Sequence, residues 1–183
     1  MPGKIAARRA YLWTLVATTW GVVSVAGQQD DLLFVGYPRD DESAAIDDIA
    51  VSLGSLGTRD DSSARDYRDL IADYFEGRPL NWSELPVRFR GTEFQCRVWQ
   101  TTRQIPYGQT WTYGEVARAC GLPLAARPVG TALAANRAGL LVPCHRVVAV
   151  GNIGGYGGWR ERKRDLLRLE GVRADLSGPT PSA

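Results

Sequence analysis

The stretch Thr112-Tyr-Gly-Glu-Val-Ala-Arg-Ala-Cys-Gly-Leu-Pro123 decides how the second half of this chain folds. It opens with a hydroxyl that is followed three residues later by a glutamate, the capping-box signature of a helix start. Gly121 and Pro123 then end the helix, which we expect over residues 113–120. A further helix follows to about Ala135. Two short helices joined by a tight glycine-containing turn predict a helix-turn-helix, although many helical hairpins of this kind bind no DNA.

The same capping signature occurs upstream at Thr92-Glu-Phe-Gln95. It predicts a helix over residues 93–103 that buries Phe94, Val98 and Trp99, and Ile105-Pro-Tyr-Gly108 ends this helix. A last helix is expected over residues 159–169, before Gly171. Its basic residues are Arg160, Arg162, Lys163, Arg164 and Arg168.

The N-terminal segment has two interpretations. Basic residues at positions 4, 8 and 9 precede the apolar run Tyr11–Gly27, as in a secretory signal peptide. The other interpretation is a β-hairpin in which Trp20–Ala26 and Leu32–Tyr37 flank the polar turn Gly27–Asp31. Threonines and tryptophans suit strands better than a signal sequence, so we favour the hairpin. No run is long and apolar enough to span a membrane.

The remainder of the first half predicts a loop, a helix and an extended segment. Pro38–Asp48 is acidic and loop-like, and Asn81–Arg90 is expected to run extended. Between them, apolar residues recur at helical spacing over Ser63–Phe75, and Gly77-Arg-Pro79 stops that helix. We expect an α+β protein with a small α/β domain over residues 1–88, a mainly helical domain over 89–172 and a disordered tail over 173–183.

Charge is distributed unevenly along the 183 residues, whose net charge is only +2. Residues 1–88 carry 9 Lys/Arg and 14 Asp/Glu, a net charge of −5, whereas residues 89–183 carry 13 Lys/Arg and 6 Asp/Glu, a net charge of +7. This asymmetry favours contact between the second half and a polyanion, but a solvated basic surface explains the charge equally well.

The three cysteines, Cys96, Cys120 and Cys144, are too few and too odd in number for a disulfide framework. They fit a reducing compartment, and we expect a cytoplasmic protein. A structural zinc site needs four nitrogen or sulfur ligands and would use both Cys144 and the only histidine, His145. We therefore expect no metal.

The stretch Leu140-Leu-Val-Pro-Cys-His-Arg-Val-Val148 carries the chemistry. A thiol acts as a nucleophile mainly as the thiolate, and neighbouring basic groups lower its pKa. Cys144 is followed directly by His145 and Arg146. A buried strand with a structural cysteine explains these residues equally well, because adjacent side chains on an extended chain point to opposite faces.

Pro143-Cys-His-Arg-Val147 resembles the active-site signature of the O6-alkylguanine-DNA alkyltransferases. The resemblance extends in order over about residues 88–171 and only loosely over the first half. Its other motifs are Gly91–Gln95, Ile105–Gly108, Thr112–Glu115, Ala126-Arg127 with Val129-Gly130, Ala135-Asn136 and Leu169–Gly171.

This resemblance implies a ribonuclease H-like α/β domain followed by a winged helix-turn-helix domain. It implies DNA repair by a single transfer of an alkyl group to Cys144 from O6 of guanine, and from O4 of thymine, in duplex DNA. The alkylated atom is buried in the base stack, so the base must be flipped out. The partner is then double-stranded DNA containing O6-alkylguanine, with no small-molecule cofactor, no membrane and a monomeric protein.

The resemblance also implies residue roles. Cys144 accepts the alkyl group, His145 acts on it through a water, and Glu170 polarises His145. Asn136 braces the turn that presents Cys144, and Tyr113 hydrogen-bonds guanine N3. Arg127 fills the gap left by the flipped nucleotide. The remaining substrate-binding or DNA-binding positions are Gly130, Ala134, Arg146, Val147, Tyr156 and Gly157.

Each auxiliary residue also has a structural interpretation. Tyr113 could simply pack on the core, Arg127 could contact a phosphate, and Asn136 could cap a helix. Glu170 could be a surface acid that pairs with Lys163 or Arg168. Cys96 and Cys120 are assigned to packing.

Four positions depart from the family pattern. Pro128 disfavours helical backbone at Arg127, so we expect the second helix of the pair to start late. Arg137 and Gly139 stand where prolines are usual, and Trp159 replaces a glycine. The rival in another class is a non-catalytic alkyltransferase-like DNA-damage binding module, against which the retained Cys144 argues. A thiol hydrolase or transferase for small molecules leaves the helix-turn-helix unexplained.

Overall fold

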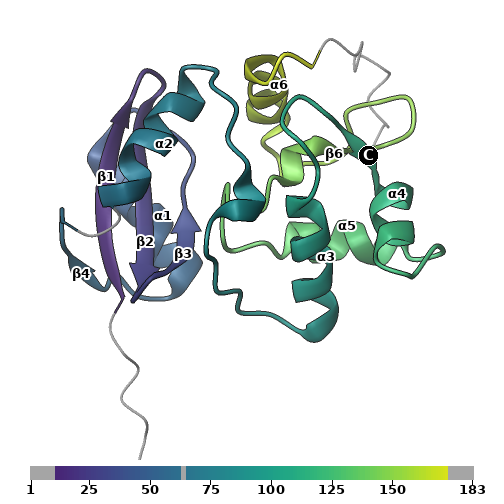
Figure 1. Cartoon of the computed structure of the whole chain (residues 1–183), viewed down its shortest axis with the longest axis horizontal. Coiled ribbons are helices and arrows are strands. Elements are labelled where there is room, and N and C mark those ends of the chain that lie inside the picture. Colours follow the sequence, from purple (N-terminus) through teal and green to yellow (C-terminus); the bar gives the residue numbers. More distant parts are fainter. Residues whose placement is uncertain (1–10, 63–64, 173–183) are drawn as a thin grey trace, which may run out of the picture.

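The computed structural model describes residues 11–62 and 65–172. A mixed sheet occupies the first half (Figure 1), with β1 (Leu12–Thr18), β2 (Gly21–Gln28), β3 (Asp31–Val35) and β4 (Thr58–Arg59) in the order β3-β2-β1-β4. The first three strands are antiparallel neighbours, and β4 runs parallel to β1. The hairpin predicted around residues 20–37 is confirmed as β2 and β3, and its turn places Gln29 at φ 57°.

Alternating side chains give the sheet two buried faces, as the two-residue period of a strand requires. On one face Trp13, Leu15 and Phe34 pack against Ala45 and Ile49 of the first helix. The other face belongs to the main core, which continues into the second half. Its sheet residues are Val16, Val23, Val25, Leu32 and Val35.

The acidic segment predicted as a loop contains a helix start, so that prediction is wrong. Helix α1 spans Glu42–Leu53, and the Asp41 carboxylate accepts a hydrogen bond from the Ala44 amide at 2.8 Å. Acidic residues suit this position because they accept from free amides and face the positive end of the helix dipole. Gly54 ends the helix at φ 78°.

The helix predicted over Ser63–Phe75 is confirmed in its described part, whereas the segment after it is not wholly extended. Helix α2 spans Arg65–Phe75, and the start proposed at Ser63 lies outside the described residues. The following segment forms the 3-10 helix η1 (Trp82–Glu84), in which Trp82 is fully buried. The Arg103 guanidinium donates to the carbonyls of Trp82 and Leu85 and so fixes this segment.

The second half contains the capped helices that the sequence predicts. Helix α3 spans Glu93–Arg103 and α4 spans Tyr113–Ala119, each with both hydrogen bonds of its capping box. Val98 and Trp99 are buried, whereas Phe94 only packs at the core's edge. The later elements are α5 (Ala126–Ala134), η2 (Cys144–Arg146), β6 (Val147–Val148), parallel to β5 (Trp111–Thr112), and α6 (Arg160–Leu169).

Helix α5 begins at Ala126, so the expected late start is wrong. Pro128 is the third residue of this helix. The first four amides of a helix have no intrahelical acceptor, so a proline within the first turn loses no helical hydrogen bond there. Arg127 therefore lies on the first turn, where its side chain is exposed.

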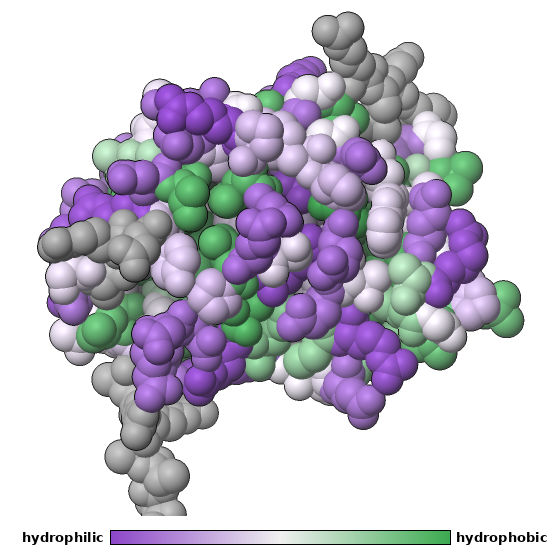
Figure 2. All heavy atoms as spheres, in the orientation of Figure 1, coloured by the Kyte–Doolittle hydropathy of each residue, from purple (hydrophilic) through white to green (hydrophobic). Residues whose placement is uncertain are grey.

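The two halves are joined by backbone hydrogen bonds and by one shared core. The Leu140 amide donates to the Val35 carbonyl at 2.8 Å, and the Val35 amide donates to the Ala138 carbonyl at 3.2 Å. The main core runs from Val16 in β1 to Leu166 in α6. On the face shown in Figure 2, polar and apolar residues are interleaved. Among the described residues no helix has the length and apolar character needed to cross a bilayer.

Candidate active site around Cys144

A cavity of about 430 Å³ lies beside Cys144. The structure brings several residues singled out in the sequence to its wall: Tyr113, Gly130, Ala134, Asn136, Cys144, Tyr156 and Gly157. Other lining residues carried no predicted role, among them Tyr37, Leu133 and Gly155. The pocket thus draws on the first half, on α4 and α5, and on the segment after β6.

Asn136 holds the turn that follows α5, and its side-chain amide lies near the thiol. Its side-chain amide donates to the Gly139 carbonyl at 2.9 Å, and its side-chain oxygen accepts from the Ala138 amide at 2.8 Å. The same Nδ2 lies 3.9 Å from Cys144 Sγ. Asn136 follows Ala135, the C-terminal cap of α5, and the bracing role that the resemblance implies for it stays a prediction.

Gly139 occupies a backbone conformation that explains its departure from the family pattern. Its φ is 62°, and a Cβ atom there would lie 1.9 Å from the Val35 carbonyl oxygen. A proline is restricted to φ near −65° and could not adopt this conformation. The close approach of β3 to residues 138–140 therefore requires glycine.

The surroundings of Cys144 shift the pKa of its thiol in opposite directions. Burial raises the pKa of the thiol. The nearby ammonium of Lys163 acts in the opposite direction, as do hydrogen bonds from Asn136 and from the hydroxyls of Tyr156 and Tyr37. These groups stabilise the thiolate in a pocket that otherwise favours the neutral thiol.

Two backbone carbonyls hold Lys163 near Cys144. Its Nζ donates to the Val147 carbonyl at 2.6 Å and to the Gly155 carbonyl at 3.2 Å, and the side chain is fully buried. Burial lowers the pKa of Lys163 to about 8, although the neighbouring Cys144 raises it. Lys163 therefore joins β6 to the segment that carries Tyr156, and it does not pair with Glu170.

His145 and Glu170 form a buried pair behind the thiol. His145 Nε2 lies 2.8 Å from Glu170 Oε1, and both side chains are inaccessible to solvent. Burial lowers the pKa of His145, and Glu170 only partly offsets this, so the ring is neutral at pH 7. A neutral ring that donates through Nε2 keeps its lone pair on Nδ1. This Nδ1 has no protein hydrogen-bond partner within residues 11–62 and 65–172.

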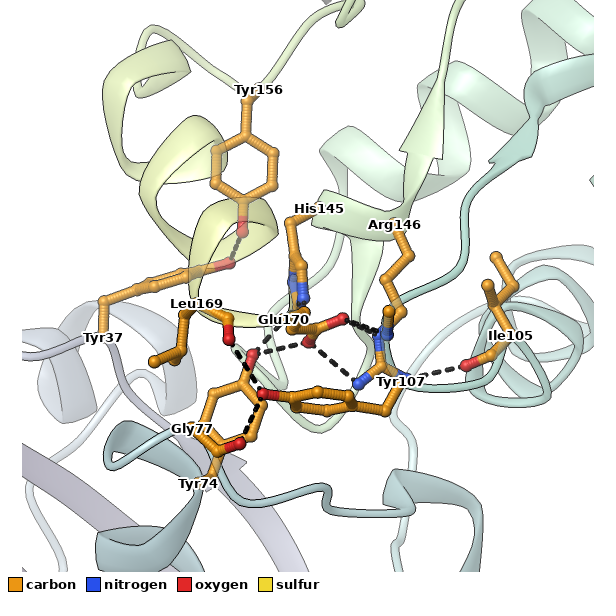
Figure 3. A network of polar contacts seen from close by, with 11 residues as sticks. Tyr37, Tyr74, Gly77, Ile105, Tyr107, His145, Arg146, Tyr156, Leu169 and Glu170 are labelled. Carbon is orange, nitrogen blue, oxygen red and sulfur yellow. Dashed lines mark hydrogen bonds and ion pairs between the residues drawn. The ribbon is translucent and has the colours of Figure 1, made fainter. Parts of the chain in front are cut away.

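Glu170 is the centre of a larger network (Figure 3) and is not a surface acid. The Tyr74 hydroxyl donates to Oε1 at 2.7 Å, and the Arg146 guanidinium donates to both carboxylate oxygens at 2.9 Å. Burial by itself would raise the pKa of Glu170, but His145 and Arg146 outweigh it and hold the pKa at about 2. The carboxylate is therefore ionised, and both of its oxygens accept hydrogen bonds.

The assignment of Arg146 to DNA contact is wrong. Its side chain is 1% exposed, and its third donor, Nη1, binds the Ile105 carbonyl at 2.7 Å. Val147 is also buried, and its carbonyl is bound by Lys163. The family resemblance implied that Arg146 binds substrate or DNA, whereas the 3-10 turn at residues 144–146 places its side chain in the interior.

Two predicted residues lie nearer the surface. Tyr113 begins α4 and lines the pocket, with its hydroxyl 3.5 Å from the Gly155 carbonyl, so it combines the packing role with a position at the site. Arg127, on the first turn of α5, does not line the cavity.

Sequence reasoning assigned no site role to Tyr37 or Tyr74. Tyr37 ended a predicted strand and Tyr74 lay on the apolar face of a predicted helix, and neither pattern signals a site. Their hydroxyls reach groups more than 70 residues away along the chain, namely Tyr156 and Glu170.

The chain is similar to proteins of one known family. The family model described as "6-O-methylguanine DNA methyltransferase, DNA binding domain" matches residues 93–172. A methylated-DNA–protein-cysteine methyltransferase of Methanosarcina acetivorans is 35% identical over 152 residues, 82% of this chain and 92% of that protein. One of Mycobacterium tuberculosis is 49% identical over 107 residues, 58% of this chain but only 64% of the relative's length.

Solved structures show the same similarity over most of the chain. The crystal structure of Mycobacterium tuberculosis O6-methylguanine methyltransferase has a TM-score of 0.70 and 34% identity, covering 91% of this chain and 98% of that one. The structure of the M. tuberculosis OGT in complex with DNA has the same scores and coverage. A buried histidine–carboxylate pair behind a pocket thiol defines a cysteine-centred site. The chain belongs to the methylated-DNA–protein-cysteine methyltransferase family.

Proposed function

We propose that this protein repairs DNA by moving an alkyl group from O6 of guanine in duplex DNA to Cys144, in a single turnover. The observation that carries the proposal is the position of the Cys144 thiol on a pocket wall, next in the chain to a neutral His145 ring that is paired with the ionised Glu170 carboxylate. Family membership and the DNA complex of the M. tuberculosis protein add support. O4-alkylthymine is proposed as a second substrate.

In the proposed reaction the proton of the Cys144 thiol passes through a water to His145 Nδ1. The resulting imidazolium is stabilised by Glu170, whose pKa of about 2 keeps it ionised. The sulfur attacks the alkyl carbon as the carbon–O6 bond breaks, and the electron pair of that bond leaves with guanine. The Tyr113 hydroxyl donates to the departing base at N3. The product is a thioether that no group of the pocket can hydrolyse, so each molecule acts once.

Binding to DNA is proposed to use α4 and α5 as the two helices of a winged helix-turn-helix, within a domain that spans residues 89–172. The base is flipped into the pocket, and Arg127 fills the vacated place in the stack. Residues 1–88 are proposed to form a ribonuclease H-like domain, a proposal supported by the order β3-β2-β1-β4 with β4 parallel to β1. Gly130, Ala134 and Gly157 line the proposed base pocket.

The test is intact-mass spectrometry after incubation with duplex DNA that contains O6-methylguanine. The wild type and Cys96→Ser should each gain one methyl group, whereas Cys144→Ser should gain none and still bind DNA, because a hydroxyl has far too high a pKa. Cys96 is a matched control because it is a partly exposed cysteine on α3, away from the pocket. Wild-type protein that binds the damaged DNA without gaining mass would instead support the non-catalytic damage-binding module.

A further inference from the structure

Tyr37 reaches the pocket from the first half of the chain. It follows β3 and lines the cavity beside Cys144. Its hydroxyl is hydrogen-bonded to the hydroxyl of Tyr156, and the two rings meet edge to face with centroids 5.9 Å apart (Figure 3). Tyr156 lines the same cavity as Tyr37 and Cys144. Tyr37 therefore borders the space next to the reacting atom.

The backbone on both sides of Tyr37 is fixed. The Gly36 amide donates to the Ser24 carbonyl at 2.8 Å. Arg39 exchanges two backbone hydrogen bonds with Val22, at 2.8 and 2.9 Å. The Arg39 guanidinium also forms a two-pronged contact with the Asp48 carboxylate, at 2.7 and 2.5 Å. A side chain carried on such a backbone cannot easily move aside for a ligand.

Trp159 of the second half contacts the segment that carries Tyr37, through Arg39. Two guanidiniums lie within cation–π distance of the Trp159 ring, that of Arg162 at 4.0 Å and that of Arg39 at 5.2 Å from the ring centre. The Arg39 contact crosses between the halves and adds to the attachment of the residue 155–159 segment to the first half. Tyr37 and Tyr156 are thus held against each other from both sides.

We propose that the Tyr37 ring is a wall that limits the size of the alkyl group this protein accepts, so that methyl adducts are favoured over bulky ones. The inference rests on the proposed transfer to Cys144. In a reactive complex the alkyl carbon must lie about 3–3.5 Å from the sulfur. Any further atoms on that carbon must then fit beside the two tyrosine rings. A methyl group adds no such atoms, whereas a benzyl group adds a whole ring.

The test compares single-turnover rates on duplexes that carry either O6-methylguanine or O6-benzylguanine at the same position. The readout is the ratio of the benzyl rate to the methyl rate. Loss of the Tyr37 hydroxyl also changes the pKa of the Cys144 thiol. Both reactions use the same sulfur, so a change in the reactivity of that sulfur cancels in this ratio. The proteins are the wild type, Tyr37→Ala, Tyr37→Phe and Trp20→Ala, with folding checked by thermal melting.

Tyr37→Ala should raise the benzyl-to-methyl ratio about tenfold or more, the effect expected when a pocket gains room for a few carbon atoms. Tyr37→Phe should leave it within about threefold, because the ring remains. Trp20→Ala should not change it, since Trp20 is a partly exposed ring that contacts Phe75 and does not line the cavity.

Two results would overturn the inference alone, provided that the wild type and Tyr37→Ala transfer methyl groups. The first is a ratio in folded Tyr37→Ala that stays within about twofold of the wild type. The second is an equal rise in Tyr37→Phe and Tyr37→Ala, which would assign the limit to the hydroxyl and not to the ring. Absence of methyl transfer by the wild type would overturn the proposed function and this inference with it.

Discussion

The buried ion pair between Glu170 and Arg146 is expected to make a large contribution to stability that depends on both partners. Glu170→Gln preserves the shape of the side chain and can still accept from Tyr74. The amide cannot accept both donors of Arg146, which are each 2.9 Å from the carboxylate in the wild type. Arg146 is 1% exposed, so it would become a buried cation without an anion. Such a change costs about 3–5 kcal/mol.

Arg146→Met should cost a similar amount, because it leaves the Glu170 carboxylate without its cation and removes the donor to the Ile105 carbonyl. The double variant removes both charges at once. Replacing a whole buried pair by uncharged groups is often nearly neutral. The cost of the double variant should therefore be smaller than the sum of the single costs by at least about 2 kcal/mol.

The measurement is the free energy of unfolding from urea titrations at pH 7 for the four proteins of this cycle. Glu161→Gln is the matched control, because Glu161 pairs with Arg164 on the same helix but is 78% exposed. It should cost less than about 1 kcal/mol. The reasoning is refuted if either single variant at the buried pair costs no more than this control, or if the two single costs simply add.

Three further predictions concern acidity, base flipping and backbone space. The pKa of Glu170 is about 2 against an ordinary 4.5, so its contribution is complete above pH 4.5 and is lost as the pH falls towards 2. Urea titrations should thus show wild-type stability falling by about 1 kcal/mol or more between about pH 5.5 and about pH 3.5, and unchanged stability would contradict this. Arg127→Ala should slow single-turnover repair of O6-methylguanine in duplex DNA far more than reaction with the free modified base, which needs no flipping; equal slowing would mean that Arg127 does not fill the stack. Gly139→Ala, whose Cβ would lie 1.9 Å from the Val35 carbonyl oxygen at φ 62°, should destabilise the fold by about 2 kcal/mol or more in urea titrations. Gly121→Ala has a similar φ of 75° but open space around it, so an equal cost in both variants would rule out the clash with Val35.

Most helices of the second half could be predicted because their signals are local. The side chains of Thr92 and Thr112 each cap the helix that follows within three residues. The helices of the first half were harder to predict, because acidic residues there are typical both of loops and of helix starts. Asp41 lies in an acidic cluster typical of a loop and yet caps α1. In the second half, the start of α5 could not be predicted from Pro128, because a proline can either delay a helix or lie within its first turn.

The sequence by itself determined the reactive centre and its family, because the Pro143–Val147 motif and the motifs around it are local and ordered along the chain. Only the tertiary structure decided what surrounds that centre. It turned Arg146 inward to Glu170 and brought Tyr37 to Tyr156, 119 residues away. The physical reason is that capping and periodicity act over a few residues, whereas burial and the partners of buried charges depend on which distant segments the fold packs together.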